Sequence, residues 1–204
     1  MKICHVITRL IIGGAQENTV LSCRGLAAKG HDVTLLAGPE TGPEGSLWQL
    51  ARESGAKTIE LESMRRAVRP LDDFRAYCEL IARFKELKPD VVHTHSSKAG
   101  ILGRAAAAKA AVPVIVHTIH GMSFNRTQPW LARTAYRLLE RRAARYTNKI
   151  VTVADAMIDQ AVAVGIGSRD QMVTIRSGLE LAQFAPNEQS RKAVRAEWGV
   201  ADDE

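Results

Sequence analysis

The sequence has little cysteine, few aromatic residues and no long hydrophobic run. Its three cysteines, in 204 residues, are too scattered for a disulfide framework or a CxxC metal site, which suits a reducing cytoplasm. Aromatic residues make up only 5% of the chain, too few to stack the bases of single-stranded nucleic acid. His5, Thr8 and Arg9 interrupt the apolar start, and Pro113 and two histidines lie in the longest uncharged stretch, residues 110–125. The sequence therefore predicts neither a signal peptide nor a membrane-spanning helix.

What the chain has instead is an excess of positive charge. The formal net charge of +6 favours anionic partners, which include nucleic acid, an anionic bilayer and phosphorylated small molecules. No helix-turn-helix, zinc-finger or RNA-binding motif is present, so we expect no nucleic-acid partner. The proportions of 46% hydrophobic and 25% charged residues are those of a globular protein with one sizeable core.

Short β-branched segments alternate with longer helical ones along most of the chain. Runs such as VPVIV and KIVTV are typical of strands buried on both faces. The alternation predicts an α/β fold with a Rossmann-like, doubly wound parallel sheet. The expected strands are Lys2–Ile7, Asp32–Ala37, Lys57–Leu61, Val91–Thr94, Pro113–Thr118, Lys149–Val153 and Met172–Ile175. The expected helices are Gly14–Lys29, Ser46–Ser54, Leu71–Leu87, Lys98–Ala110, Pro129–Tyr146 and Ala156–Val164.

A glycine pair opens the first expected helix. Gly13 and Gly14 would let a ligand approach the backbone closely, and the free amides and positive dipole end of the helix would face an anion such as a diphosphate. The segment has neither the G-x-G-x-x-G dinucleotide motif nor the G-x-x-x-x-G-K-[ST] phosphate loop. From these residues alone, an anion site and a simple tight turn are equally good interpretations.

Polar residues follow the fourth expected strand, at the sheet edge where doubly wound folds bind ligands. His95, Ser96, Ser97 and Lys98 are candidate ligand contacts there. His93 lies two residues before His95 and so points to the same side of the strand, but no third metal ligand is evident nearby. We therefore expect no metal and interpret His93 as a hydrogen-bonded core histidine.

The fifth expected strand also ends in a histidine. His117 and His120 are an odd number of residues apart, so they should face opposite sides of the sheet. His120, next to Gly121, is expected to be the exposed one. It is the candidate catalytic residue, because an imidazole there could hydrogen-bond a substrate hydroxyl or a developing charge.

Arginines recur at every fourth position of one expected helix and form a basic stripe, which consists of Arg133, Arg137, Arg141 and Arg145. An anionic membrane surface is one candidate partner for this stripe. The alternative, which we favour, is a solvated outer face. The packing face opposite would then consist of Leu131, Ala135, Leu138 and Leu139.

Four motifs, taken in order, resemble the N-terminal domain of the retaining glycosyltransferases of family GT4, which have the two-domain GT-B fold. They are GGAQ at the first turn, HTHSSKAG at the fourth strand, HTIHG at the fifth and RSGLE after the last. The resemblance covers the chain from Met1 to about Phe184, and this combination is far more specific than any single motif.

The resemblance implies a role for each motif. The glycine turn, here Gly13, Gly14, Ala15 and Gln16, would face the diphosphate of a nucleoside diphosphate sugar donor. His120 would lie beside the donor sugar at the reaction centre, and the segment from His95 to Lys98 would border the acceptor pocket. The interdomain cleft would be near Ser177, Gly178 and Glu180. No metal or cofactor is implied.

The resemblance also implies a domain plan and an activity. Residues 1–183 would form the acceptor-side domain and residues 184–204 the start of the interdomain linker. The donor domain, which carries an E-x7-E motif, would be missing, so the chain alone should be inactive. We treat the same spacing at Glu180 and Glu188 as coincidence, because Pro186 lies between them.

The implied reaction transfers a sugar, with retention, to a hydroxyl of a saccharide or lipid-linked acceptor in polysaccharide or glycolipid assembly. A cytoplasmic location is expected, with peripheral attachment to the inner face of the membrane as an option. Two alternatives stay open. One is a GT-B-like sugar-nucleotide epimerase, and the other is a non-catalytic module that binds an acceptor or a partner.

Overall fold

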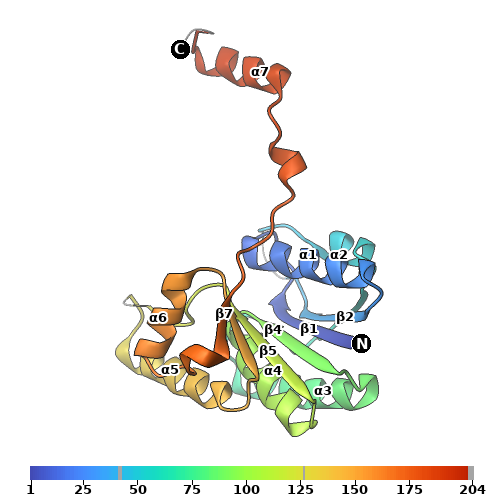
Figure 1. Cartoon of the computed structure of the whole chain (residues 1–204), viewed down its shortest axis with the longest axis vertical. Helices are drawn as coiled ribbons and strands as arrows, with labels where there is room; N and C mark the ends of the chain where they lie inside the picture. The colour runs from blue at the N-terminus through green and yellow to red at the C-terminus, as the bar shows by residue number, and fades with distance from the viewer. Residues whose placement is uncertain (41–42, 126, 202–204) are drawn as a thin grey trace.

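The computed structural model describes residues 1–40, 43–125 and 127–201, which contain one parallel, seven-stranded sheet with helices on both faces (Figure 1). The strand order is β3-β2-β1-β4-β5-β6-β7. The first three strands are added toward one edge of the sheet and the last four toward the other, so the order of addition changes between β1 and β4, which are parallel neighbours. The strands are β1 (Lys2–Arg9), β2 (Asp32–Gly38), β3 (Lys57–Glu60), β4 (Val91–His95), β5 (Val114–Ile119), β6 (Lys149–Thr152) and β7 (Met172–Thr174). The predicted doubly wound sheet is confirmed.

Every expected helix is also present, and the ends of each expected element lie within two residues of the observed ones. The helices are α1 (Gly14–Ala28), α2 (Trp48–Glu53), α3 (Pro70–Leu87), α4 (Ser97–Lys109), α5 (Trp130–Ala144), α6 (Asp155–Ala163) and α7 (Glu188–Trp198), with 3-10 turns η1 (Arg169–Gln171) and η2 (Leu181–Phe184). None of these helices, within the described ranges, is long and apolar enough to cross a bilayer.

The helices bury both faces of the sheet, but not evenly. Helices α1 and α2 pack on β1 and β2 through a core that includes Val20, Leu35 and Ala51. Helices α3 and α4 cover the opposite face around Leu80 and Val92. Helices α5 and α6 continue this second layer over β5 to β7. On the α1 side, however, Val114 of β5 (38%) and Val173 of β7 (41%) stay exposed, as does Ile175 (58%), which directly follows β7.

Helix α4 approaches the sheet very closely at two glycines. A Cβ atom on Gly100 would lie 2.5 Å from the ring of His117, and one on Gly103 would lie 2.8 Å from the side chain of Thr94. Real Cβ atoms do not come this close, so a larger residue would push the helix outward. The two glycines thus allow the first two turns of α4 to lie against the ends of β4 and β5, where the candidate site lies.

Beyond β7 the chain leaves the sheet. Figure 1 shows the segment that follows running away from the layered domain, with α7 standing apart from it. None of the described residues of α7 is buried.

Candidate functional site

A cavity of about 270 Å³ lies at the carboxyl ends of β4 and β5. Its walls come from segments that are far apart in the sequence: Ala15 from the start of α1, Ser96 and Ser97 from the start of α4, residues 117–124 from β5 and the following loop, Glu140 from α5, and Ile166. This is the edge at which doubly wound sheets bind their ligands. Three motifs that we predicted separately therefore meet in one cavity.

The start of α1 presents unpaired backbone amides. Gly13 precedes the helix, and its carbonyl accepts the first helical hydrogen bond, from the Glu17 amide, at 2.9 Å. No described side chain caps this helix end, so its leading N–H groups and the positive end of its dipole are available to an anion. Ala15 lines the cavity, whereas Gly13, Gly14 and Gln16 lie outside its wall. A Cβ on Gly14 would meet no atom within 4 Å, so the approach to this turn is open.

The structure separates the four residues that were expected to act together after β4. Ser96 and Ser97 line the cavity. His95 does not, because it is 1% exposed and lies beneath the site. Lys98 turns to the other side of α4, where its ammonium group donates to Asp73 at 2.5 Å and to the carbonyl of Ala67. The sequence could not reveal this division, since the change from strand to helix at Ser97 points successive side chains in different directions.

Ser96 is held in an unusual conformation at this junction. Its φ of 60° lies in the left-handed region, which is costly for a residue other than glycine. Thr8, at the end of β1, secures it with a hydroxyl–hydroxyl contact of 2.7 Å and also accepts the amide of Ala99 at 3.2 Å. The end of β1 therefore supports the turn that leads into α4 and keeps both serines at the cavity.

Four histidines gather beside the cavity on the α1 side of the sheet. The His5 Nδ1 atom lies 3.0 Å from Nε2 of His95, and His95 Nδ1 lies 3.1 Å from Nε2 of His120. His93 contacts the Thr118 hydroxyl at 2.7 Å, which confirms the predicted hydrogen bond, and its side chain is partly buried. These contacts join His120, which lines the cavity, to two buried rings in a line.

His117 faces the other side of the sheet, as its spacing from His120 predicts. It contacts the backbone carbonyl of Thr94 at 3.1 Å and the hydroxyl of the same residue at 3.0 Å. His120 is the more exposed of the two, since it is half-buried whereas His117 is 3% exposed.

Burial keeps the rings in the line of histidines neutral near pH 7. Desolvation lowers the pKa of His5 to about 4. It is also the main reason why the pKa of His95 is well below its usual value, with neighbouring histidines as further causes. The pKa of His120 is lowered by the same desolvation. All three rings can therefore donate one hydrogen bond and accept one.

The direction of the hydrogen bonds along this line follows from the single donor and single acceptor of each neutral ring. Each neutral ring has one N–H, so the two bonds must point the same way. If they pointed toward His5, its Nε2–H would be buried without an acceptor among the described residues. Orphaned buried N–H groups are rarer than unfilled acceptors, so the bonds should run from His5 through His95 to His120. His120 then keeps its Nδ1–H to donate to a ligand.

The same cluster contains a third residue that could bind a metal ion beside His93 and His95. This residue is His5, which the sequence did not reveal. Ring nitrogens of His5, His93 and His95 all lie within 4.8 Å of one another. However, the His5–His95 separation of 3.0 Å is a hydrogen-bond distance, whereas ligands of tetrahedral zinc lie about 3.3 Å apart. The spacing favours a hydrogen-bonded cluster over a metal centre.

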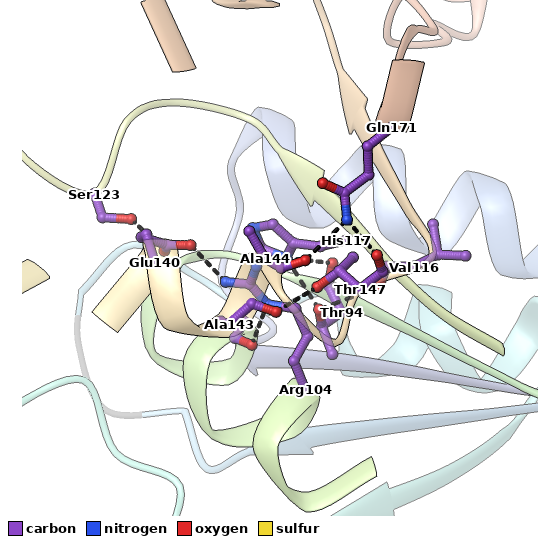
Figure 2. A network of polar contacts seen from close by, with 11 residues as sticks. Thr94, Arg104, Val116, His117, Ser123, Glu140, Ala143, Ala144, Thr147 and Gln171 are labelled. Carbon is purple, nitrogen blue, oxygen red and sulfur yellow. Dashed lines mark hydrogen bonds and ion pairs between the residues drawn. The ribbon is translucent and has the colours of Figure 1, made fainter. Parts of the chain in front are cut away.

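Figure 2 shows a network of polar contacts around Arg104 and Glu140, on the α4 side of the sheet. Arg104 of α4 is fully buried, donates to the Gly100 carbonyl at 2.7 Å and pairs with Glu140 of α5 at 2.5 Å. The second oxygen of Glu140 accepts from Ser123 at 2.7 Å, so the pair fastens the loop that follows His120. The sequence did not reveal this network, because a charge on a helix looks the same whether it faces solvent or a partner 36 residues away.

The residues predicted near an interdomain cleft lie outside the cavity. Ser177, Gly178 and Glu180 are exposed in the segment that follows β7. The Glu180 carboxylate pairs with Arg24 of α1, which draws this segment toward the α1 side.

The prediction of which residues of α5 pack against the protein is wrong. The predicted packing residues Leu131, Leu138 and Leu139 are 64%, 55% and 44% exposed. The buried residues are instead Glu140, Ala143 and Ala144, because α5 packs closely only through its last two turns. Of the arginine stripe, Arg133 and Arg145 are exposed, whereas Arg141 donates to the Val164 carbonyl at 2.5 Å. The stripe is therefore not a uniform solvated surface.

Comparison with known proteins identifies the family. Residues 13–178 match the model of the glycosyl transferase 4-like domain. The chain belongs to this family. The match spans the glycine turn, both histidine segments and the first part of the RSGLE motif, and it confirms the resemblance seen in the sequence.

Individual relatives agree with this assignment. The glycosyl transferase 4-like domain is 31% identical over 188 residues to the Escherichia coli UDP-Gal:alpha-D-GlcNAc-diphosphoundecaprenol alpha-1,3-galactosyltransferase, covering 91% of this chain and 47% of that enzyme. Anabaena HepE in complex with UDP has a TM-score of 0.73 at 14% identity, over 98% of this chain and 50% of that one. The UDP-GlcNAc 2-epimerase of Neisseria meningitidis bound to UDP-GlcNAc has a TM-score of 0.61 at 16% identity, over 100% of this chain and 55% of that one. The domain thus spans about half the length of these proteins, and the two structural matches show a shared fold.

Proposed function

We propose that the protein containing this domain is a retaining glycosyltransferase, which transfers a sugar from a nucleoside diphosphate sugar to a hydroxyl of a lipid-linked acceptor. The observation that carries the proposal is the single cavity, which joins the start of α1 at Ala15 to the Ser96–Ser97 turn and to His120. An anion site, polar groups for hydroxyls and a positioned imidazole are what this reaction requires.

The donor diphosphate is assigned to the start of α1. Its free amides and dipole would stabilise the charge that develops on the leaving diphosphate. UDP is the nucleotide we favour, because the E. coli relative is named for UDP-Gal and Anabaena HepE was solved with UDP. No metal or cofactor is assigned a role. His120 would donate its Nδ1–H to an oxygen of the donor sugar, and Ser96 and Ser97 would contact the acceptor.

A second domain would complete the donor site. The domain covers 47% of its E. coli relative, and the exposed side chains of Val114, Val173 and Ile175 leave part of one sheet face without cover. We assign residues 1–183 to the acceptor-side domain and the exposed segment with Ser177, Gly178 and Glu180 to the interdomain cleft. The reading frame that follows Glu204 tests this assignment, because it should encode a Gly-rich loop and an E-x7-E motif.

The acceptor class suggests a location at the membrane. The E. coli relative is named for a diphosphoundecaprenol acceptor, and such a lipid is anchored in a bilayer. We therefore place the protein at the cytoplasmic face of the membrane as a peripheral protein. The arginine stripe adds little to this placement, since Arg141 is engaged within the protein.

The test measures transfer with the full-length protein. Radiolabelled UDP-sugar is incubated with and without a prenyl diphosphate saccharide, and labelled lipid should form only when both are present. His120→Ala should lower kcat by about 10²-fold, whereas His31→Ala, which changes a histidine remote from the cavity, serves as the matched control. Deuterium uptake from D₂O into the UDP-sugar without acceptor would contradict transfer and support an epimerase. Binding of the acceptor without any turnover would support a non-catalytic module.

A further inference from the structure

One short loop, residues 65–69, contributes to the walls of two hollows that differ in chemistry. Arg65, Arg66 and Arg69 of this loop line a hollow of about 660 Å³ together with Arg9. Val68 of the same loop lines a second hollow, of about 380 Å³, between α3, α4 and α5. One loop therefore borders both a cationic surface and an apolar one, and Lys98 of the apolar wall donates to the carbonyl of Ala67 in the cationic wall.

The wall of the cationic hollow has more positive than negative side chains. Its wall contains four arginines and one carboxylate, that of Glu44, which pairs with Arg9 at 3.5 Å. Arg69 lies 3.8 Å from the Asp72 carboxylate. Arg65 and Arg66 are exposed, and neither pairs with a carboxylate in the described part of the chain. Paired guanidinium groups match the geometry of phosphate oxygens, so this hollow fits a phosphate or diphosphate group.

The second hollow fits a hydrocarbon chain. Its wall is formed mainly by aliphatic side chains, and Val68 and Leu139 remain 67% and 44% exposed although they are apolar. Asp73 is the one acidic residue in this wall, and its charge is neutralised by Lys98 at 2.5 Å. Leu71 and Phe74, near the start of α3, are also exposed, at 77% and 64%. Exposed apolar groups of this kind beside cations are typical of surfaces that contact lipid.

Both hollows are connected to the candidate site through residues that are neighbours in the chain. Arg9 of the cationic hollow follows Thr8, whose hydroxyl contacts Ser96 at 2.7 Å. Lys98 of the apolar hollow follows Ser97, which lines the cavity. A molecule that occupied both hollows would therefore have its polar end near Arg9, at the carboxyl end of β1.

We propose that these two hollows form one binding site for a lipid diphosphate, with the diphosphate held by Arg65 and Arg66 and the first part of the hydrocarbon chain lying against Val68, Ala135 and Leu139. The inference rests on the proposed function, for which it names the group that carries the acceptor sugar. The rest of the chain would stay in the bilayer, which Leu71 and Phe74 would contact.

The test measures binding without any sugar transfer, by calorimetry of the full-length protein with farnesyl diphosphate. Farnesol and inorganic diphosphate each offer half of the ligand, and both should bind at least about tenfold more weakly. Arg65→Ala/Arg66→Ala should raise the Kd for farnesyl diphosphate by about tenfold or more. Ala135→Phe, which fills the apolar hollow, should weaken farnesyl diphosphate but not inorganic diphosphate. Arg142→Ala/Arg145→Ala removes the same charge from exposed positions of another surface and should leave binding unchanged.

Three results would overturn the site: equal binding of inorganic diphosphate and farnesyl diphosphate, unchanged binding by the Arg65/Arg66 variant, or an equal loss in the Arg142/Arg145 control. The outcome is separate from that of the proposed function. Wild-type sugar transfer to a lipid acceptor by the Arg65/Arg66 variant would refute this site but leave the function in place. Binding of farnesyl diphosphate as predicted, in a protein that transfers no sugar, would support this site and refute the proposed function.

Discussion

A valine at Gly14 should weaken donor binding without harming the fold. A Cβ at this position meets no atom of the protein within 4 Å, so the new side chain would project into open space in front of the start of α1. A diphosphate bound at this helix end would occupy that space. Its interaction with the helix end contributes about 0.3–1 kcal/mol, or up to about 2 kcal/mol when partly buried. Loss of that interaction corresponds to a roughly 2- to 30-fold increase in the Kd for donor.

The chain offers a matched control in the same helix. Gly25 is exposed, and a Cβ there would also meet no atom within 4 Å, but it lies three turns away from the cavity. Gly25→Val should bind UDP as the wild-type protein does. Both variants should unfold within about 0.5 kcal/mol of the wild type, because neither side chain meets a neighbour. Calorimetric titration with UDP and a thermal unfolding curve for each variant complete the experiment. Unchanged UDP binding by Gly14→Val, or equal losses in the two variants, would refute the assignment of the diphosphate to this turn.

Three further predictions concern the buried polar groups around the cavity. The pKa of His5 is about 4 in the folded protein and about 6.5 when unfolded, so acid protonates the unfolded chain first and stability should fall as the pH drops from about 6.5 to 4. For His5 alone the loss is roughly 2 kcal/mol at pH 5, and an unchanged urea midpoint between pH 7.5 and 5 would contradict it. Glu140→Gln leaves the buried Arg104 charge without its counter-ion and should cost about 3–5 kcal/mol in urea unfolding, so a loss below about 1 kcal/mol would count against the pair. In ¹⁵N spectra of the histidine rings, His120 should carry its proton on Nδ1. His95→Asn should keep the proton there, because the asparagine amide can replace the Nδ1–H donor of His95. His95→Gln should not, because its amide does not lie at the position of Nδ1.

The last of these measurements has its own control. His93 lies in the same cluster, with its ring centre 4.3 Å from that of His95, but it is bonded to Thr118 outside the line. His93→Gln should therefore leave the His120 proton on Nδ1. A wild-type spectrum with the His120 proton on Nε2 would show that the line runs in the opposite direction.

The sequence by itself determined the sheet and the places where ligands gather. Buried parallel strands need apolar side chains on both faces, so VPVIV and KIVTV are recognisable without any knowledge of their partners. Strand ends follow from the same runs, and the topology of doubly wound sheets then places Ser96, Ser97 and His120 at one edge. The motifs in their order were also sufficient to indicate the family.

Only the tertiary structure decided which side chains meet. His5 contacts His95 from 90 positions away, and Arg104 pairs with Glu140 from 36 positions away, so no local pattern marks either pair. The direction of Lys98 depends on a left-handed residue at Ser96, and the exposure of Leu131 and Leu138 depends on which turns of α5 its neighbours cover. Periodicity reports which residues share a face of a helix or strand. What that face touches is set by the packing of elements that are distant in the chain, and this packing is what turns separate motifs into a site.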